Sequence, residues 1–357
     1  MVFEKNLRSL TRPLSALILG ALVSAILIRI VGESPWRVAE IFYNGAMGSA
    51  YDLGLSLFYT VPLILTGLAV SVGLRARLFN IGVEGQLTVA AFAAALAGIW
   101  GPQDVILNRV LGFAAALLGG FLWGAILGYL KARRQAHEVV AGIMLNFIAY
   151  GITSWLALNF FKNPDSQNPE TIPLIDAVRI PAWSYFQSAP IGWHVLLAPL
   201  AAMLLWGFYR WTEAGWGMEA VGENPKAARE AGLSIAQKQF WALAMGGMIA
   251  GIVGFIEVYG NSGKFIVGFS PAYGFMGIAV ALVGRLHPFG IVLSAALFGA
   301  IHKGSLDLDF ETEWITRDFA QILQAVLILF MSCATLVPAG IQNRLEGLKR
   351  RFYGQRP

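Results

Sequence analysis

Long apolar runs, separated by short polar connections, dominate the chain. Runs of about 20 apolar residues are long enough to cross a bilayer as helices, and about ten such candidates are present. They are Leu14–Val31, Leu53–Gly73, Leu78–Trp100, Val110–Leu130, Val139–Phe161, Ile191–Trp211, Phe240–Tyr259, Gly274–Leu286, Pro288–His302 and Phe319–Val337. The eighth and ninth runs are short. The pattern predicts an all-α polytopic membrane protein with about ten transmembrane helices, short or broken near residues 78–86 and 274–302.

The composition strengthens this prediction. Hydrophobic residues make up 57% of the 357 residues, whereas soluble domains contain about 45–50%. Charged residues make up 13%, roughly half the usual share of about 25%. The net charge of +5 does not indicate nucleic-acid binding, because the basic residues lie in short connections between apolar runs.

The placement of basic residues predicts the orientation. If both termini are cytoplasmic, most of the 26 Lys and Arg residues lie on the cytoplasmic side, as the positive-inside rule requires. Two polar segments are longer than turns. Residues 162–190 contain five prolines and form a predicted irregular extracytoplasmic loop, either a passive connector or part of a docking rim. Residues 212–239 form a predicted cytoplasmic segment.

The cytoplasmic segment contains the signals of a short, capped helix. Asn224 suits the N-cap, Pro225 suits the first helical position, and Lys226–Ala231 are helix formers. Gly232 suits the position just after the helix, where the left-handed conformation ends it. A simple connector does not need a capped surface helix, so this helix is predicted to insert into a partner protein.

Polar residues within the apolar runs are candidates for a solute pathway, because they are costly in a membrane unless they face a cavity or a partner. The candidate pathway residues are Asn80, Glu84, Gln86, Asn146, Phe147 and Phe275. Each also has a structural interpretation. Glu84 can pair with a nearby Arg at a cytoplasmic turn, and Asn146 can form a hydrogen bond between helices.

Enzymatic chemistry is not indicated. The sequence has no phosphate-binding GxxxxGK[ST] loop and no HExxH or GxSxG motif. Its one cysteine, Cys333, forms no disulfide framework, and its four histidines lack metal-ligand spacing. We expect no cofactor and no metal, and any ATP hydrolysis requires a separate polypeptide.

Several collinear motifs resemble ABC importer permeases of the branched-chain amino acid/ribose superfamily, most closely the simple-sugar or general nucleoside permease subgroup. The motifs are Phe79–Gln86, His137–Val140, Met144–Ile148, Ala220–Gly232 and Gly274–Pro288. Together they cover roughly residues 55–300.

The resemblance implies a single permease domain, residues 1–357, in the bacterial cytoplasmic membrane. It implies an ATPase subunit, a second permease in a homo- or heterodimer, and an extracytoplasmic solute-binding lipoprotein as partners, besides the lipid bilayer. It makes residues 212–239 a coupling segment that contacts the ATPase. The coupling residues would be Gly222, Glu223, Asn224, Pro225, Ala228, Arg229 and Gly232.

Alternatives remain open at this stage. The same type of ABC importer could carry branched-chain amino acids or free sugars instead of nucleosides. An ion-coupled secondary carrier would need acids along the pathway, and Glu84 is the one candidate in the sequence. A membrane scaffold without transport activity is a third class, which the polar and glycine-rich breaks disfavour.

Overall fold

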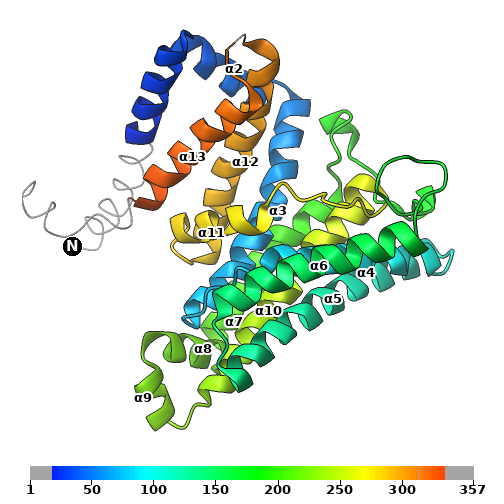
Figure 1. Cartoon of the computed structure of the whole chain (residues 1–357), viewed down its shortest axis with the longest axis vertical. Helices are drawn as coiled ribbons and strands as arrows, with labels where there is room; N and C mark the ends of the chain where they lie inside the picture. Colours follow the sequence, from blue (N-terminus) through cyan, green and yellow to red (C-terminus); the bar gives the residue numbers. More distant parts are fainter. Residues whose placement is uncertain (1–17, 313, 334–357) are drawn as a thin grey trace, which may run out of the picture. The chain divides into compact units, whose positions relative to one another are not determined.

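A computed structural model describes residues 18–312 and 314–333. Within these residues the regular elements are helices, apart from two isolated β-bridges, Lys162 with Thr171 and Glu170 with Ile266. In chain order the longer elements are the helix Ile18–Val31, α2 (Pro35–Met47), α3 (Ala50–Arg75), α4 (Val83–Trp100), α5 (Val105–Arg134), α6 (Glu138–Phe160), α7 (Leu197–Trp211), α8 (Glu213–Glu223), α9 (Pro225–Glu230), α10 (Ile235–Phe255), α11 (Tyr273–Val283), α12 (Pro288–Glu311) and α13 (Arg317–Cys333) (Figure 1).

Four shorter elements complete the list. The loop between α6 and α7 contains three 3-10 turns, η1 (Asp176–Val178), η2 (Ser184–Phe186) and η3 (Trp193–Leu196). The π-helix η4 (Ile256–Ser262) continues directly from α10. The chain divides into two compact units, residues 1–42 with 305–357, and residues 43–304.

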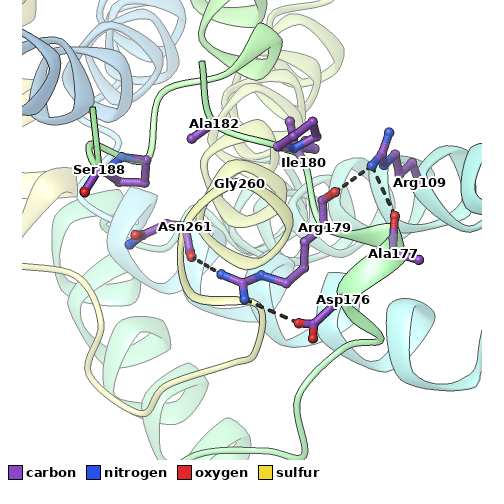
Figure 2. Close-up of a pocket in the computed structure, with 11 residues that line it drawn as sticks. Arg109, Asp176, Ala177, Arg179, Ile180, Ala182, Ser188, Gly260 and Asn261 are labelled. Atoms are coloured by element: carbon purple, nitrogen blue, oxygen red, sulfur yellow. Dashed lines mark hydrogen bonds and ion pairs between the residues drawn. The ribbon is translucent and has the colours of Figure 1, made fainter. Parts of the chain in front are cut away.

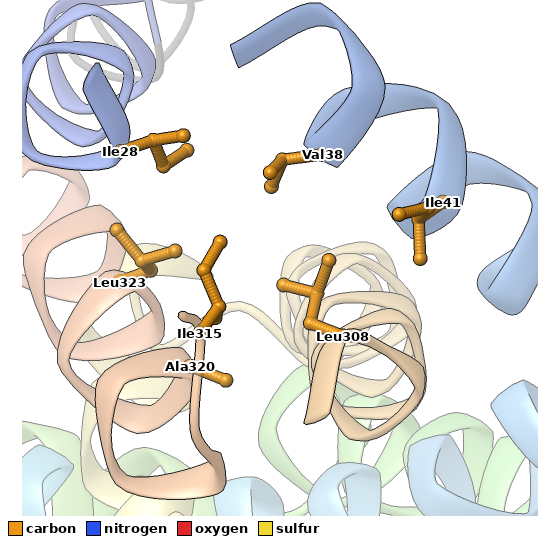
Figure 3. Close-up of a cluster of buried hydrophobic side chains, with 7 residues drawn as sticks. All are labelled: Ile28, Val38, Ile41, Leu308, Ile315, Ala320 and Leu323. Carbon is orange, nitrogen blue, oxygen red and sulfur yellow. The ribbon is translucent and has the colours of Figure 1, made fainter. Parts of the chain in front are cut away.

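The smaller unit has its own apolar core. The buried side chains come from the helix Ile18–Val31, the start of α2, the end of α12 and the region of α13, and Figure 3 shows them facing one another. They are Ile28, Val38, Ile41, Leu308, Ile315, Ala320 and Leu323. Leu27, Phe42 and Phe319 pack against this cluster.

The larger unit is built around α3 and α10. Most of α3 and α10 is buried, whereas α5 and α6 leave most of their surface exposed. α10 packs against α5, α4 and α3, and α11 packs against α3. The loop between α6 and α7 and the helix α9 lie at opposite ends of this unit (Figure 1).

The expected all-α polytopic membrane fold is confirmed, whereas the predicted number of about ten spans is not. Six of the described helices are long and apolar enough to cross a membrane, and up to eight if two bent helix pairs each count as one span. The first predicted run begins, and the last one ends, outside the described residues. α11 has only 11 residues, in agreement with the predicted short eighth run.

The prediction that the ninth helix is short is wrong. α12 extends over 24 residues, past His302, where the apolar run ends in the sequence. The reason is an ion pair: Lys303 Nζ lies 3.2 Å from the carboxylate of Asp52 in α3, and both side chains are shielded from solvent. A buried charge is tolerated when it is paired, so the charged position does not end the helix.

Glycines allow α5 and α10 to approach each other at backbone distance. A Cβ atom on Gly120 would collide with the carbonyl oxygen of Gly247, and one on Gly247 would collide with that of Gly120. A Cβ atom on Gly124 would likewise collide with the carbonyl oxygen of Leu243, and one on Gly251 with that of Ala116. Helices in lipid gain little from apolar attraction alone, so this close packing holds the pair together.

We expect Gly247→Ala to lower the free energy of unfolding of the detergent-solubilised chain by about 1–3 kcal/mol, the usual cost of overpacking. Gly151→Ala in α6 is the matched control, because a Cβ atom there meets nothing within 4 Å. Alanine is the better helix former, by about 0.8–1 kcal/mol, so the control should be neutral or stabilising. Chemical denaturation in mild detergent measures both. If Gly247→Ala is as stable as the control, α5 and α10 do not pack through these glycines.

Candidate functional site

The short helix expected in the cytoplasmic segment is present as α9. The side-chain oxygen of Asn224 accepts hydrogen bonds from the backbone N–H groups of Lys226 (3.1 Å) and Ala227 (3.2 Å). Pro225 occupies the first position of the helix. Gly232 follows the helix with a φ of +82°, the left-handed conformation that glycine adopts without strain. Both ends of α9 are therefore fixed by local interactions.

The side chains of α9 divide into one buried contact and an exposed face. Ala228 is buried, whereas Lys226, Arg229 and Glu230 are exposed. α9 lies at the end of unit 43–304, and no element of the described residues covers this face (Figure 1). α9 is therefore a helix with fixed ends that exposes a charged face.

α8 was not expected from the sequence, and it positions α9. Its N-cap Thr212 accepts a hydrogen bond from the N–H of Gly215 (3.0 Å). Near its C-terminus, Gly222 lies against the end of α3, where a Cβ atom would collide with the carbonyl oxygen of Arg75. Gly222 thus allows close packing within the chain, Glu223 ends α8, and the other predicted coupling residues lie on α9 or at its ends.

The predicted interruption between α3 and α4 is also present. After Arg75 the chain folds back along α3, so that the N–H of Leu78 donates to the carbonyl of Gly73 (2.8 Å). Asn80 and Gln86 are buried here and exchange two amide hydrogen bonds, each 3.2 Å long. This pairing satisfies both side-chain amides inside the protein.

Asn146 of α6 bridges the same interruption. Its side-chain N–H donates to the carbonyl of Ile81 (2.9 Å), and its side-chain oxygen accepts from the N–H of Gly85 (2.8 Å). The two backbone groups lie on either side of the first residues of α4, where no helical partner is available to them. Asn146 therefore supplies the hydrogen bonds that the break removes.

Glu84 connects the break to α11. Its carboxylate accepts a hydrogen bond of 2.6 Å from the N–H of Gly274, in the first turn of α11. A carboxylate at a helix N-terminus is favoured by the helix dipole and by the free N–H groups there. Gly274 leaves room for this contact, since a Cβ atom would lie 2.7 Å from the backbone nitrogen of Glu84.

The six candidate pathway residues are thus only partly brought together. Asn80, Glu84, Gln86 and Asn146 surround the break and are engaged in hydrogen bonds within the chain. The two aromatic residues point away from protein: Phe147 is 70% exposed and Phe275 is 47% exposed. No described group of three or more His, Cys, Asp or Glu side chains could hold a metal ion.

A cavity of about 700 Å³ lies at the opposite end from α9, beneath the loop between α6 and α7. Figure 2 shows two arginines in its wall. Arg109 donates to the carbonyl of Val178 (2.9 Å), and Arg179 donates to the carbonyl of Asn261 (3.1 Å). Sequence reasoning did not single out these arginines. The signal available was one Arg at the start of an otherwise apolar run.

The same loop is fastened by an ion pair. Lys264 Nζ lies 2.8 Å from the carboxylate of the buried Glu170. The hydrogen bonds from Lys264 and then Ser166 hold the pKa of Glu170 below its ordinary value. The predicted irregular loop is therefore irregular in backbone but tied at several points to α5 and to the segment after α10.

The sequence model of a family described as "Branched-chain amino acid transport system / permease component" matches residues 53–332. The chain belongs to this permease family. The match covers every element of the break, α8 and α9, and the family expected from the motifs is confirmed. A permease component is a transport subunit and not an enzyme, as the sequence indicated.

Curated relatives of this permease carry related names. A guanosine ABC transporter permease of Bacillus subtilis is 33% identical over 330 residues, covering 92% of this chain and 94% of the relative. A nucleoside ABC transporter permease of Lactococcus lactis is 28% identical, covering 92% of each chain. A glucose ABC transporter permease of Haloferax volcanii is 29% identical, covering 89% of this chain and 86% of the relative.

The bridge at the break of this permease can be tested by mutation. Asn146→Ala leaves the backbone groups of Ile81 and Gly85 without their partner, and we expect the free energy of unfolding to fall by about 1–3 kcal/mol. Asn159→Ala is the matched control, because Asn159 lies in the same helix and is exposed, and its amide bonds only to its own helix. Equal losses in the two variants, measured by denaturation in detergent, would contradict the bridging role.

Proposed function

We propose that this permease is the membrane-spanning subunit of an ATP-driven importer for nucleosides. The observation that carries the proposal is the similarity to the guanosine permease of Bacillus subtilis, which extends along 92% of this chain. The nucleoside permease of Lactococcus lactis supports the same solute class. The proposed partners are an ATPase subunit, a second permease, identical or different, and an extracytoplasmic solute-binding lipoprotein.

We place both termini and α9 on the cytoplasmic side of a bacterial cytoplasmic membrane. This orientation puts most Lys and Arg residues inside. It puts the cavity lined by Arg109 and Arg179 outside, where a solute-binding protein would deliver its solute. Residues 162–190 then form the extracytoplasmic loop, and residues 212–239 form the coupling segment.

α9 is the proposed contact with the ATPase. It is short, it is capped at both ends, and one face remains exposed although the helix itself is fixed. Such a helix transmits force without bending, because its ends are held by hydrogen bonds within the segment. In this proposal Asn224, Pro225 and Gly232 shape the helix, Ala228 seats it, and Arg229 contacts the partner. Gly222 and Glu223 connect it to α3 through α8.

The pathway role of Asn80, Glu84, Gln86, Asn146, Phe147 and Phe275 stays a prediction. The hydrogen bonds of the first four explain their presence without a solute. Glu84 is engaged at the N-terminus of α11, which disfavours a role as the ion-binding acid of a secondary carrier. A sugar is the second candidate solute, supported by the glucose permease of Haloferax volcanii.

The coupling assignment predicts the effect of Arg229→Glu. The side chain is exposed, so the chain should fold normally. Co-purification of the ATPase should fall about tenfold, the loss that follows when an interface residue contributes about 1.4 kcal/mol. Arg134→Glu, at the exposed end of α5, is the control for a change in charge.

If the Arg229→Glu variant retains full ATPase binding and full uptake, the assignment of α9 as the contact with the ATPase is wrong. A substitution at Gly222, such as Gly222→Trp, cannot test whether α9 contacts the ATPase. Any side chain at residue 222 collides with the backbone of Arg75 and disturbs the fold itself.

The solute assignment is tested by uptake into cells or proteoliposomes that contain the complete transporter. We expect ATP-dependent uptake of labelled guanosine or adenosine, reduced by an excess of another nucleoside but not by leucine, ribose or glucose. Competition by glucose alone would select the sugar alternative. Uptake that survives ATP depletion but stops when a protonophore is added would select a secondary carrier.

A further inference from the structure

Arg75, the last residue of α3, contacts three other parts of unit 43–304. Its guanidinium donates two hydrogen bonds to the carbonyl oxygen of Leu286, from Nε (3.0 Å) and Nη2 (2.8 Å). Its Nη1 forms an ion pair with the carboxylate of Glu219 in α8. The guanidinium also lies over the ring of Tyr209 in α7, 4.3 Å from its centroid. One side chain thus joins α3, α7, α8 and the corner between α11 and α12.

The backbone of Arg75 is part of the same junction. Its carbonyl oxygen lies against Gly222 of α8, where even a Cβ atom would not fit. α8 is therefore held to the end of α3 twice, by close backbone packing and by the ion pair between Arg75 and Glu219. Since α9 follows α8 after one residue, a displacement of α9 acts directly on this junction.

The corner that Arg75 binds has an unusual backbone. Arg285 and Leu286 are consecutive non-glycine residues with φ angles of 54° and 58°, in the left-handed region. Such residues are strained, and the conformation persists only where the surroundings hold it. The two hydrogen bonds from Arg75 to the carbonyl of Leu286 are contacts of this kind.

α11 is a rod of 11 residues whose two ends are held by different groups. Glu84 binds the backbone of its first turn, and Arg75 binds the corner that follows its last residue. The helix packs along α3 between these points. A movement of the Arg75 junction therefore shifts one end of α11 while the other stays attached to α4.

We infer that Arg75 is a positioning residue that transmits movement of α8 and α9 to the corner between α11 and α12. The inference rests on the proposed function, in which an ATPase moves α9. We expect the ATPase to bind without Arg75, because the Arg75 side chain is mostly buried whereas Lys226, Arg229 and Glu230 of α9 are exposed. Its loss should separate ATP hydrolysis from solute movement.

The test uses the complete transporter in proteoliposomes, with labelled guanosine as the solute. For Arg75→Gln we expect normal co-purification of the ATPase and continued ATP hydrolysis, with guanosine transported per ATP hydrolysed falling about tenfold, within the usual range of coupling between sites. Arg210→Gln is the matched control, because it is the same substitution at an exposed Arg next to Tyr209, and it should keep the wild-type ratio.

Two further variants keep the test decisive if Arg75→Gln folds poorly. Glu219→Gln removes only the ion pair to α8, and the Glu219 side chain is 37% exposed, so folding should be preserved while the transport-to-hydrolysis ratio falls. Arg75→Lys keeps the charge but loses the paired donors to Leu286, and it should restore the ratio only in part.

The outcomes separate the two proposals. If the wild-type transporter shows no ATP-dependent guanosine uptake, the proposed function fails. If the wild type transports guanosine and both Arg75→Gln and Glu219→Gln keep its transport-to-hydrolysis ratio, only the role of Arg75 fails. A parallel loss of ATPase binding and uptake in Glu219→Gln would make the junction part of the docking surface and would also overturn the inference.

Discussion

Hydrogen bonding of the backbone where α3 gives way to α4 is the constraint on which the rest of the larger unit depends. Helical hydrogen bonding stops at Arg75 and resumes at Val83, which leaves N–H and C=O groups near the start of α4 without helical partners. Side chains supply the partners: Asn146 binds the carbonyl of Ile81 just before α4 and the N–H of Gly85 in its first turn, and Asn80 pairs with Gln86. Glu84, one turn later, fixes the start of α11. The positions of α4, α6 and α11 therefore follow from one set of polar contacts.

The helices of this unit are joined in two different ways. α5 and α10 touch through their backbones at Gly120 and Gly247, an arrangement that leaves no room for sliding. The corner between α11 and α12 is instead joined to α3 and α8 through the side chain of Arg75. Backbone packing over a long surface resists movement, whereas a single side chain can exchange its partners. The contrast divides the unit into a rigid helix pair and a junction suited to movement.

Structural features that depend on neighbouring residues were predictable from the sequence, whereas features that depend on residues far apart in the chain were not. The cap at Asn224, Pro225 and the left-handed Gly232 act within a few residues, so the sequence sufficed to predict α9. α8 was missed because Gly215, Gly217 and Gly222 are poor helix formers, and the helix instead packs against α7, α10 and the end of α3. The length of α12 depends on a partner far away in sequence: Lys303 ends the apolar run but is neutralised by Asp52. The polar residues near the break were located correctly, yet their partners could not be read from spacing alone.

The contacts at the break also limit how the permease can move. A conformational change that opened the break would remove the partner of the Ile81 carbonyl and of the N–H of the buried Gly85, and an unpaired buried backbone group is costly. Movement that keeps these hydrogen bonds is favoured. A short helix that turns about its contact with Glu84 while its other end shifts at Arg75 meets this condition, since the bonds of Asn146 and Asn80 are untouched. In such a movement Glu84, which the sequence suggests as a solute-site residue, is the fixed point about which α11 turns.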